Sequence, residues 1–137
     1  MLTANLVAKK LCEILRRHGS SELTFSTSLF TGQPSEKADI SGQIGGRKFR
    51  VMMFERSKDN SFPSVSVHFS SDISDLRLPE ERMAFWNADN RFSKMYRQDG
   101  AHAFVVYDSF FPSSPDDAFI ESVVNIWAGA LRDVAKL

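Results

Sequence analysis

Residues 83–107 read MAFWNADNRFSKMYRQDGAHAFVVY, and this stretch decides the fold because the spacing of its apolar residues changes partway through. Met83, Trp86 and Asn90 recur at helical spacing, which predicts an amphipathic helix. A short strand follows, Asp99 and Gly100 supply a tight turn, and alternating apolar residues up to Tyr107 predict a second strand. The stretch therefore predicts a helix that leads directly into a β-hairpin.

The chain before this stretch predicts one helix and a run of strands. Apolar residues three and four positions apart in residues 3–18 are typical of an amphipathic helix. Polar and apolar residues then alternate in four segments, which predicts four strands: residues 23–29, 38–44, 47–56 and 64–70. Gly45 and Gly46 join two of these strands, and they indicate a hairpin because its tight turn requires positive φ at both positions.

The chain after the stretch predicts one closing helix. Ser114 is the expected N-cap, Pro115 the first helical residue, and Asp116 and Asp117 the acids that favour the positive end of the helix dipole. Taken together, the elements predict an α+β fold in a single domain, residues 1–137. Its antiparallel sheet of about six strands carries helices on one face, in the order α-β-β-β-β-α-β-β-α.

Composition and charge restrict the function classes. The 137 residues include 17 basic and 17 acidic side chains, so no global field attracts nucleic acid or an anionic membrane. Cys12 is the single cysteine, which excludes an intramolecular disulfide and any multi-cysteine metal site. The chain has neither the apolar core of a signal peptide nor an apolar run long enough to span a bilayer. We therefore expect a cytoplasmic protein that does not enter membranes.

Two groups of residues are candidates for binding a partner. The predicted strand over residues 47–56 places Arg50 and Phe54 on one face, where basic and aromatic side chains together suit either single-stranded nucleic acid or a protein partner. We favour the protein, because the aromatic consensus of RNA-recognition strands is not matched. Phe110 and Phe111 lie beside Pro112, where they can form an exposed anchor or pack under the last helix. All four residues are assigned to partner binding.

Four further residues are expected to form the junction between helix and hairpin: Trp86, Asn87, Asn90 and Arg91. Asparagines at a helix end commonly form hydrogen bonds with the backbone of the connection that follows. We expect at least one of the two asparagines to fix this junction.

The search for catalytic chemistry gives no candidate. Glu80 and Glu81, like the two aspartates at 116–117, are explained by helix dipoles, because adjacent helical residues point about 100° apart and cannot face one substrate. The three histidines lie far apart in the sequence, and none sits in a ligand motif. No phosphate-binding loop, dinucleotide fingerprint or nucleophile elbow is present. We therefore predict neither an enzyme nor a cofactor or metal site.

The helix end and the hairpin resemble a known family. Residues 86–96 combine an asparagine-bearing helix end with Arg-Phe, a basic residue and an aromatic residue, and Asp99-Gly100 precedes an apolar strand. This pattern resembles the YbjN-like domain, a family described as bacterial sensory transduction regulators. Such domains are similar in fold to the small dimeric chaperones of type III secretion. The resemblance implies protein binding rather than catalysis, and a possible homodimer. The segment 110–112 and a less acidic strand-to-helix connection depart from the family pattern.

Overall fold

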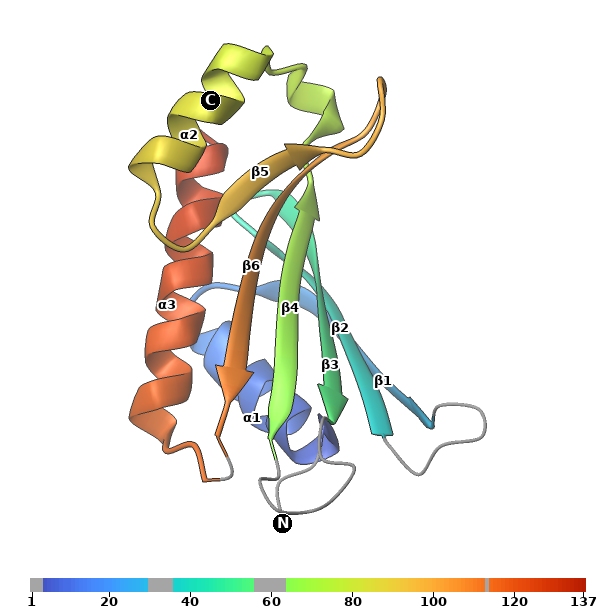
Figure 1. Cartoon of the computed structure of the whole chain (residues 1–137). Helices are drawn as coiled ribbons and strands as arrows, with labels where there is room; N and C mark the ends of the chain where they lie inside the picture. Colours follow the sequence, from blue (N-terminus) through green and yellow to red (C-terminus); the bar gives the residue numbers. More distant parts are fainter. Residues whose placement is uncertain (1–3, 30–35, 56–63, 113) are drawn as a thin grey trace.

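The computed structural model describes residues 4–29, 36–55, 64–112 and 114–137 (Figure 1). These ranges contain three helices, six strands and a short 3-10 helix. In chain order they are α1 (Ala4–Arg17), β1 (Ser21–Leu29), β2 (Glu36–Ile44), β3 (Arg47–Glu55), β4 (Val65–Asp72), η1 (Ser74–Leu76), α2 (Glu80–Asp89), β5 (Lys94–Arg97), β6 (Ala103–Phe111) and α3 (Asp117–Val134). The predicted α+β class and element order are confirmed.

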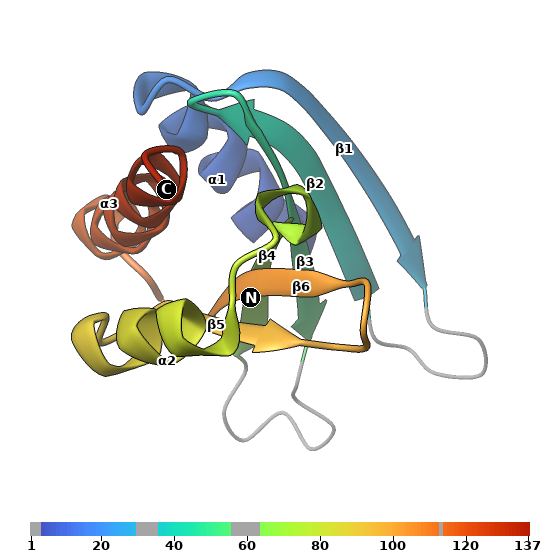
Figure 2. The same cartoon turned by 90° about the horizontal axis from the view of Figure 1, so that it is seen from above.

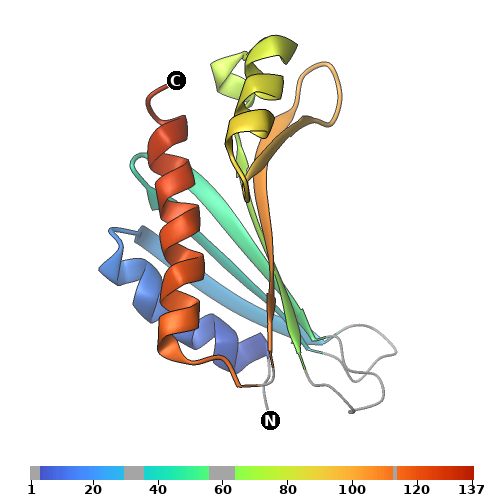
Figure 3. The same ribbon diagram turned by 60° about the vertical axis from the view of Figure 1, so that its left-hand side comes forward.

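The six strands form one sheet in the order β1-β2-β3-β4-β6-β5, and every pair of neighbours is antiparallel. Helices α1 and α3 pack side by side against one face of the sheet (Figure 3). Helix α2 lies alongside β5 at the end of the sheet, whereas β1 forms the opposite end (Figure 2). No described helix covers the second face, which we call the outer face.

The core lies between the sheet and helices α1 and α3. Trp127 of α3 is fully buried at its centre. The Phe69 ring lies 5.4 Å from the Trp127 ring, and the Phe49 ring meets it edge-on at 6.4 Å. Alternate residues of β3 and β4 face this tryptophan because side chains along a strand point to opposite faces. The remaining residues of those strands therefore face outward.

Local chemistry explains the turn between β2 and β3. Gly45 and Gly46 have φ values of 59° and 80°, and Ile44 pairs with Arg47 across the turn. These angles match the two-residue turn whose twist suits a hairpin. The predicted hairpin is confirmed.

The start of α3 differs from the prediction. The N-cap is Asp116, whose side chain accepts a hydrogen bond from the Phe119 N–H at 2.8 Å. The assignment of Ser114 as the cap is wrong, because the helix begins at Asp117 and an N-cap must directly precede the first helical residue.

Within the described ranges, no helix is both long enough and apolar enough to cross a membrane.

Candidate functional site

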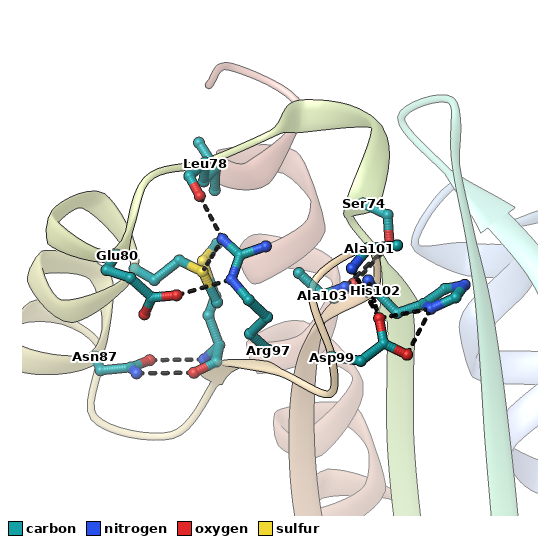
Figure 4. Close-up of polar contacts among 11 residues, drawn as sticks. Ser74, Leu78, Glu80, Asn87, Arg97, Asp99, Ala101, His102 and Ala103 are labelled. Carbon is teal, nitrogen blue, oxygen red and sulfur yellow. Dashed lines mark hydrogen bonds and ion pairs between the residues drawn. The ribbon is translucent and has the colours of Figure 1, made fainter.

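The helix-to-hairpin junction is held by the side-chain amide of Asn87. Its Nδ2 donates to the Met95 carbonyl oxygen at 2.8 Å, and the Met95 N–H donates to Asn87 Oδ1 at 2.6 Å (Figure 4). Asn90 Nδ2 donates to the Trp86 carbonyl oxygen at 3.1 Å, within the last turn of α2. The expectation that an asparagine fixes this junction is confirmed for Asn87.

Two basic residues, Lys94 and Arg97, also hold the junction. The sequence analysis did not select them. Lys94 Nζ donates to the Asn87 and Asn90 carbonyl oxygens at 2.7 and 2.6 Å, which satisfies backbone groups left open at the end of α2. Arg97 donates to Glu80 Oε1 and to the Leu78 carbonyl oxygen, both at 2.7 Å, and ties β5 to the start of α2 (Figure 4).

Arg91 does not belong to this junction. Its side chain is exposed, and it forms no hydrogen bond or ion pair with any residue that the structure describes. The prediction for Arg91 is therefore wrong: Lys94 bonds the Asn90 carbonyl at the end of α2, and Arg97 bonds the Leu78 carbonyl just before its start. Trp86 is buried as expected, and its indole nitrogen has no hydrogen-bond partner in the described part of the chain.

The turn between β5 and β6 is fixed by Asp99. One carboxylate oxygen accepts hydrogen bonds from the Ala101 and His102 N–H groups at 2.7 and 2.9 Å, and the carboxylate lies 3.0 Å from His102 Nδ1 (Figure 4). The Ala101 amide, then the His102 side chain, lowers the pKa of Asp99. The same carboxylate raises the pKa of His102. This exposed pair stabilises the turn, and it is not part of any described group of three side chains that could hold a metal ion.

The outer face carries two aromatic clusters. At one end, Phe54 of β3 and Phe110 of β6 lie opposite the same residue, Ser66 of β4, and Phe110 is 54% exposed. At the other end, Tyr96 of β5 stacks on Phe104 of β6 with ring centroids 5.6 Å apart, and Tyr96 is 46% exposed. We call these four aromatic residues the aromatic sheet face.

Several charged side chains on the outer face are paired with one another. The Asp39 carboxylate lies 3.0 Å from the Arg50 guanidinium and 3.9 Å from Lys37 Nζ. His68 lies 2.6 Å from Asp108 near the middle of the face. Arg50 and Lys37 therefore each have an acid beside them, whereas Lys48, which is exposed on the same face of β3, forms no ion pair with a described residue.

Phe110 and Phe111 point to opposite faces of β6. Phe111 is fully buried, with its ring 5.3 Å from the Phe119 ring of α3 in an edge-on arrangement. Strand β6 extends through Phe111, because it pairs there with Val65. The assignment of Phe111 to partner binding is therefore wrong, whereas Arg50, Phe54 and Phe110 lie on the outer face as expected.

A second apolar surface, which the sequence analysis missed, lies between α2 and the end of α3. We call it the α2–α3 groove; its volume is about 280 Å³, and its lining residues include Arg82, Phe85, Trp86, Lys136 and Leu137. Phe85 is the most exposed large apolar residue described, at 73%. The groove mixes aromatic and apolar side chains with charges of both signs.

Metal-ligating groups do not converge in the described ranges. No three histidine, cysteine, aspartate or glutamate side chains there are arranged to hold a metal ion. Burial raises the pKa of the Cys12 thiol, which disfavours the reactive thiolate.

Comparisons with known proteins do not assign the chain to a family. No family model matches it, and no curated protein matches it. The similarity of residues 86–96 to the YbjN-like domain stays a prediction.

Proposed function

We propose that this protein is a non-enzymatic protein-binding module, a regulator or a chaperone-like protein, that binds its partner through the aromatic sheet face. The observation that carries this proposal is the exposure of Phe110 and Tyr96 on a sheet face that no described helix covers. Aromatic residues supply much of the energy of protein interfaces.

The exposed aromatic area is large enough to matter. A complete aromatic side chain buries about 150–250 Å². With 54% of Phe110 exposed, covering it removes roughly 100 Å² from water, a gain of about 2–3 kcal/mol before the entropic cost of association. Tyr96 offers a similar area and also a hydroxyl that can form a hydrogen bond at an interface. Two such anchors at the two ends of the face suit an extended protein surface.

Single-stranded nucleic acid is the second candidate partner, because Arg50 and Phe54 lie together on this face. The ion pair between Arg50 and Asp39 weakens this alternative, since a phosphate would have to displace a carboxylate that is already in place. Fluorescence anisotropy with a labelled single strand tests it. Binding that falls with salt and is lost in Arg50→Ala would favour nucleic acid over a protein.

The cytoplasm is the compartment that we propose, and a reduced, buried Cys12 is compatible with it. The resemblance to YbjN-like domains supports the regulatory or chaperone-like role. It does not identify the partner.

Affinity capture with matched surface variants tests the proposed function. The wild-type protein, a Tyr96→Ala/Phe110→Ala variant and a Phe85→Ala control are used as baits in the same extract. We expect a specific set of co-purifying proteins that is lost with the double variant and retained with the control. Loss with Phe85→Ala alone would move the binding surface to the α2–α3 groove. Equal unfolding curves for all three baits exclude an effect of stability.

A further inference from the structure

The two edges of the sheet differ in how their backbone groups are satisfied. Strand β5 has four residues and lies beside α2, and the Asn87 amide bonds both the N–H and the carbonyl of Met95. Strand β1 has nine residues and pairs only with β2 among the described strands. Unpaired edge strands are templates for another strand, and proteins normally protect them. The β5 edge is therefore covered at Met95, whereas no described strand pairs with the outer side of β1.

The register shows which residues of β1 have outward backbone groups. In a two-residue hairpin the residues that flank the turn form a hydrogen-bonded pair, here Ile44 and Arg47, and hydrogen-bonded pairs then recur at every second position. The backbone N–H and carbonyl of Ile40 therefore form hydrogen bonds with β3. Those of Asp39 form hydrogen bonds with its partner on β1, Ser26. It follows that the N–H and carbonyl of Phe25, next to Ser26, point away from the sheet.

The sequence of this edge lacks the usual protection. Residues 23–29 read LTFSTSL, without a charged residue or a proline. A register shift near Glu22, whose φ is 54°, interrupts only the start of the strand. Phe25 is 41% exposed on the face that carries the helices, although it lies in the middle of a strand. Charges, prolines and bulges along an edge oppose pairing; Glu22 and the register shift lie at the start of β1, so pairing is permitted from Thr24 onward.

We propose that β1 pairs antiparallel with β1 of a second copy of this chain, about a two-fold axis at Phe25. This pairing places Phe25 opposite its counterpart, and Thr24 opposite Ser26 on both sides of the axis. Aromatic pairs and threonine–serine pairs each stabilise an antiparallel ladder, and no like charges come opposite each other. The outward backbone groups of Phe25 gain partners, and its exposed ring gains a neighbour.

A second copy satisfies these requirements better than an unrelated strand. The segment is complementary to itself, and the zero formal net charge of the chain opposes no self-association. The outer faces of two copies would join into one continuous surface, so dimerisation leaves the aromatic sheet face accessible. The inference does not depend on the proposed function, because β1 and the aromatic sheet face are different surfaces.

Sedimentation velocity of the full chain over a range of concentrations is the primary test. Because strand pairing alone gives a small interface, we expect a reversible dimer with micromolar dissociation. In Phe25→Lys, two ammonium groups would meet across the axis, and we expect only monomer. Phe85→Lys makes the same change at an exposed phenylalanine away from β1, and it should dimerise like the wild type. A monomeric wild type at several hundred micromolar, or a dimer lost in Phe85→Lys and kept in Phe25→Lys, overturns the proposal.

Disulfide cross-linking locates the axis independently of the lysine variants. Single cysteines replace Thr24, Phe25 or Ser26 in a Cys12→Ala background. Only a residue on the two-fold axis faces its own counterpart, at a Cα separation of about 5.5 Å that a disulfide can span. We expect Phe25→Cys to cross-link fastest. A dimer that cross-links fastest through Thr24→Cys or Ser26→Cys, or through none of the three, contradicts this arrangement.

Discussion

The Asn87 side chain completes the β5 edge, and Asn87→Ala removes two hydrogen bonds to the Met95 backbone. The Met95 N–H and carbonyl then lose their partner at a buried residue. Each such bond contributes about 0.5–1.5 kcal/mol net, so we expect the free energy of unfolding to fall by about 2 kcal/mol. For a chain of this length that corresponds to a decrease in Tm of roughly 6–10 °C.

Asn90→Ala is the matched control for this change. The Trp86 carbonyl that receives the Asn90 amide at 3.1 Å also receives the Asn90 N–H at 2.8 Å, so the side-chain bond is partly redundant. We expect a loss of about 0.5 kcal/mol for this variant, at the low end for one hydrogen bond. Asn87→Asp should resemble Asn87→Ala, because it keeps the acceptor for the Met95 N–H but turns a carboxylate oxygen toward the Met95 carbonyl.

Urea unfolding followed by circular dichroism measures all three variants under the same conditions. The slope of the transition should stay constant, since the same surface becomes exposed in each variant. A loss below about 0.5 kcal/mol for Asn87→Ala, or a larger loss for Asn90→Ala than for Asn87→Ala, would show that the amide of Asn87 does not hold the hairpin.

Three further predictions follow from the described contacts. Phe111→Ala should cost about 3–5 kcal/mol by leaving a core cavity, whereas Phe110→Ala should cost less than about 1 kcal/mol; urea unfolding compares them. The pKa of His102 is raised above 6.5, so its stabilisation is complete below that pH and lost as pH rises through the raised value. The pKa of Asp99 is lowered from 3.8, so its stabilisation is present above that pH and lost as pH falls through the lowered value. Unfolding midpoints measured against pH should therefore lose both dependences in Asp99→Asn, and an unchanged profile would refute the pairing. Cys12 should react with a thiol reagent only after unfolding, and rapid labelling of the native protein would contradict its burial.

The fold was predictable because the spacing of apolar residues differs between a helix and a strand. Alternation through Val51 and Met53 marks a strand with one buried face, and Gly45 with Gly46 marks the turn before it. The end of β6 was harder to predict. Residues 110 and 111 lie directly before Pro112, yet pairing with β4 continues up to the residue before the proline. Local residue preference cannot report pairing between segments that lie far apart in the chain.

The candidate site was only partly predictable for the same reason. Lys94 and Arg97 act on backbone carbonyls that come close only after α2 folds against β5, so their roles have no local pattern. The stack of Tyr96 on Phe104, in contrast, did have a local pattern. Once Asp99 and Gly100 are placed in a turn, the hairpin register puts these two aromatic residues opposite each other.

The unequal edges of the sheet also determine how large an assembly can become. Pairing of β1 with β1 about a two-fold axis uses the same edge of both copies, and this closes the interface at two chains. The opposite edge is occupied by Asn87 at Met95, so the joined sheet offers no equivalent open strand for a third copy. We therefore expect sedimentation to level off at the mass of a dimer as concentration rises. Trimers or an open-ended series would mean that β5 or another surface also pairs, and that the Asn87 amide does not close the edge.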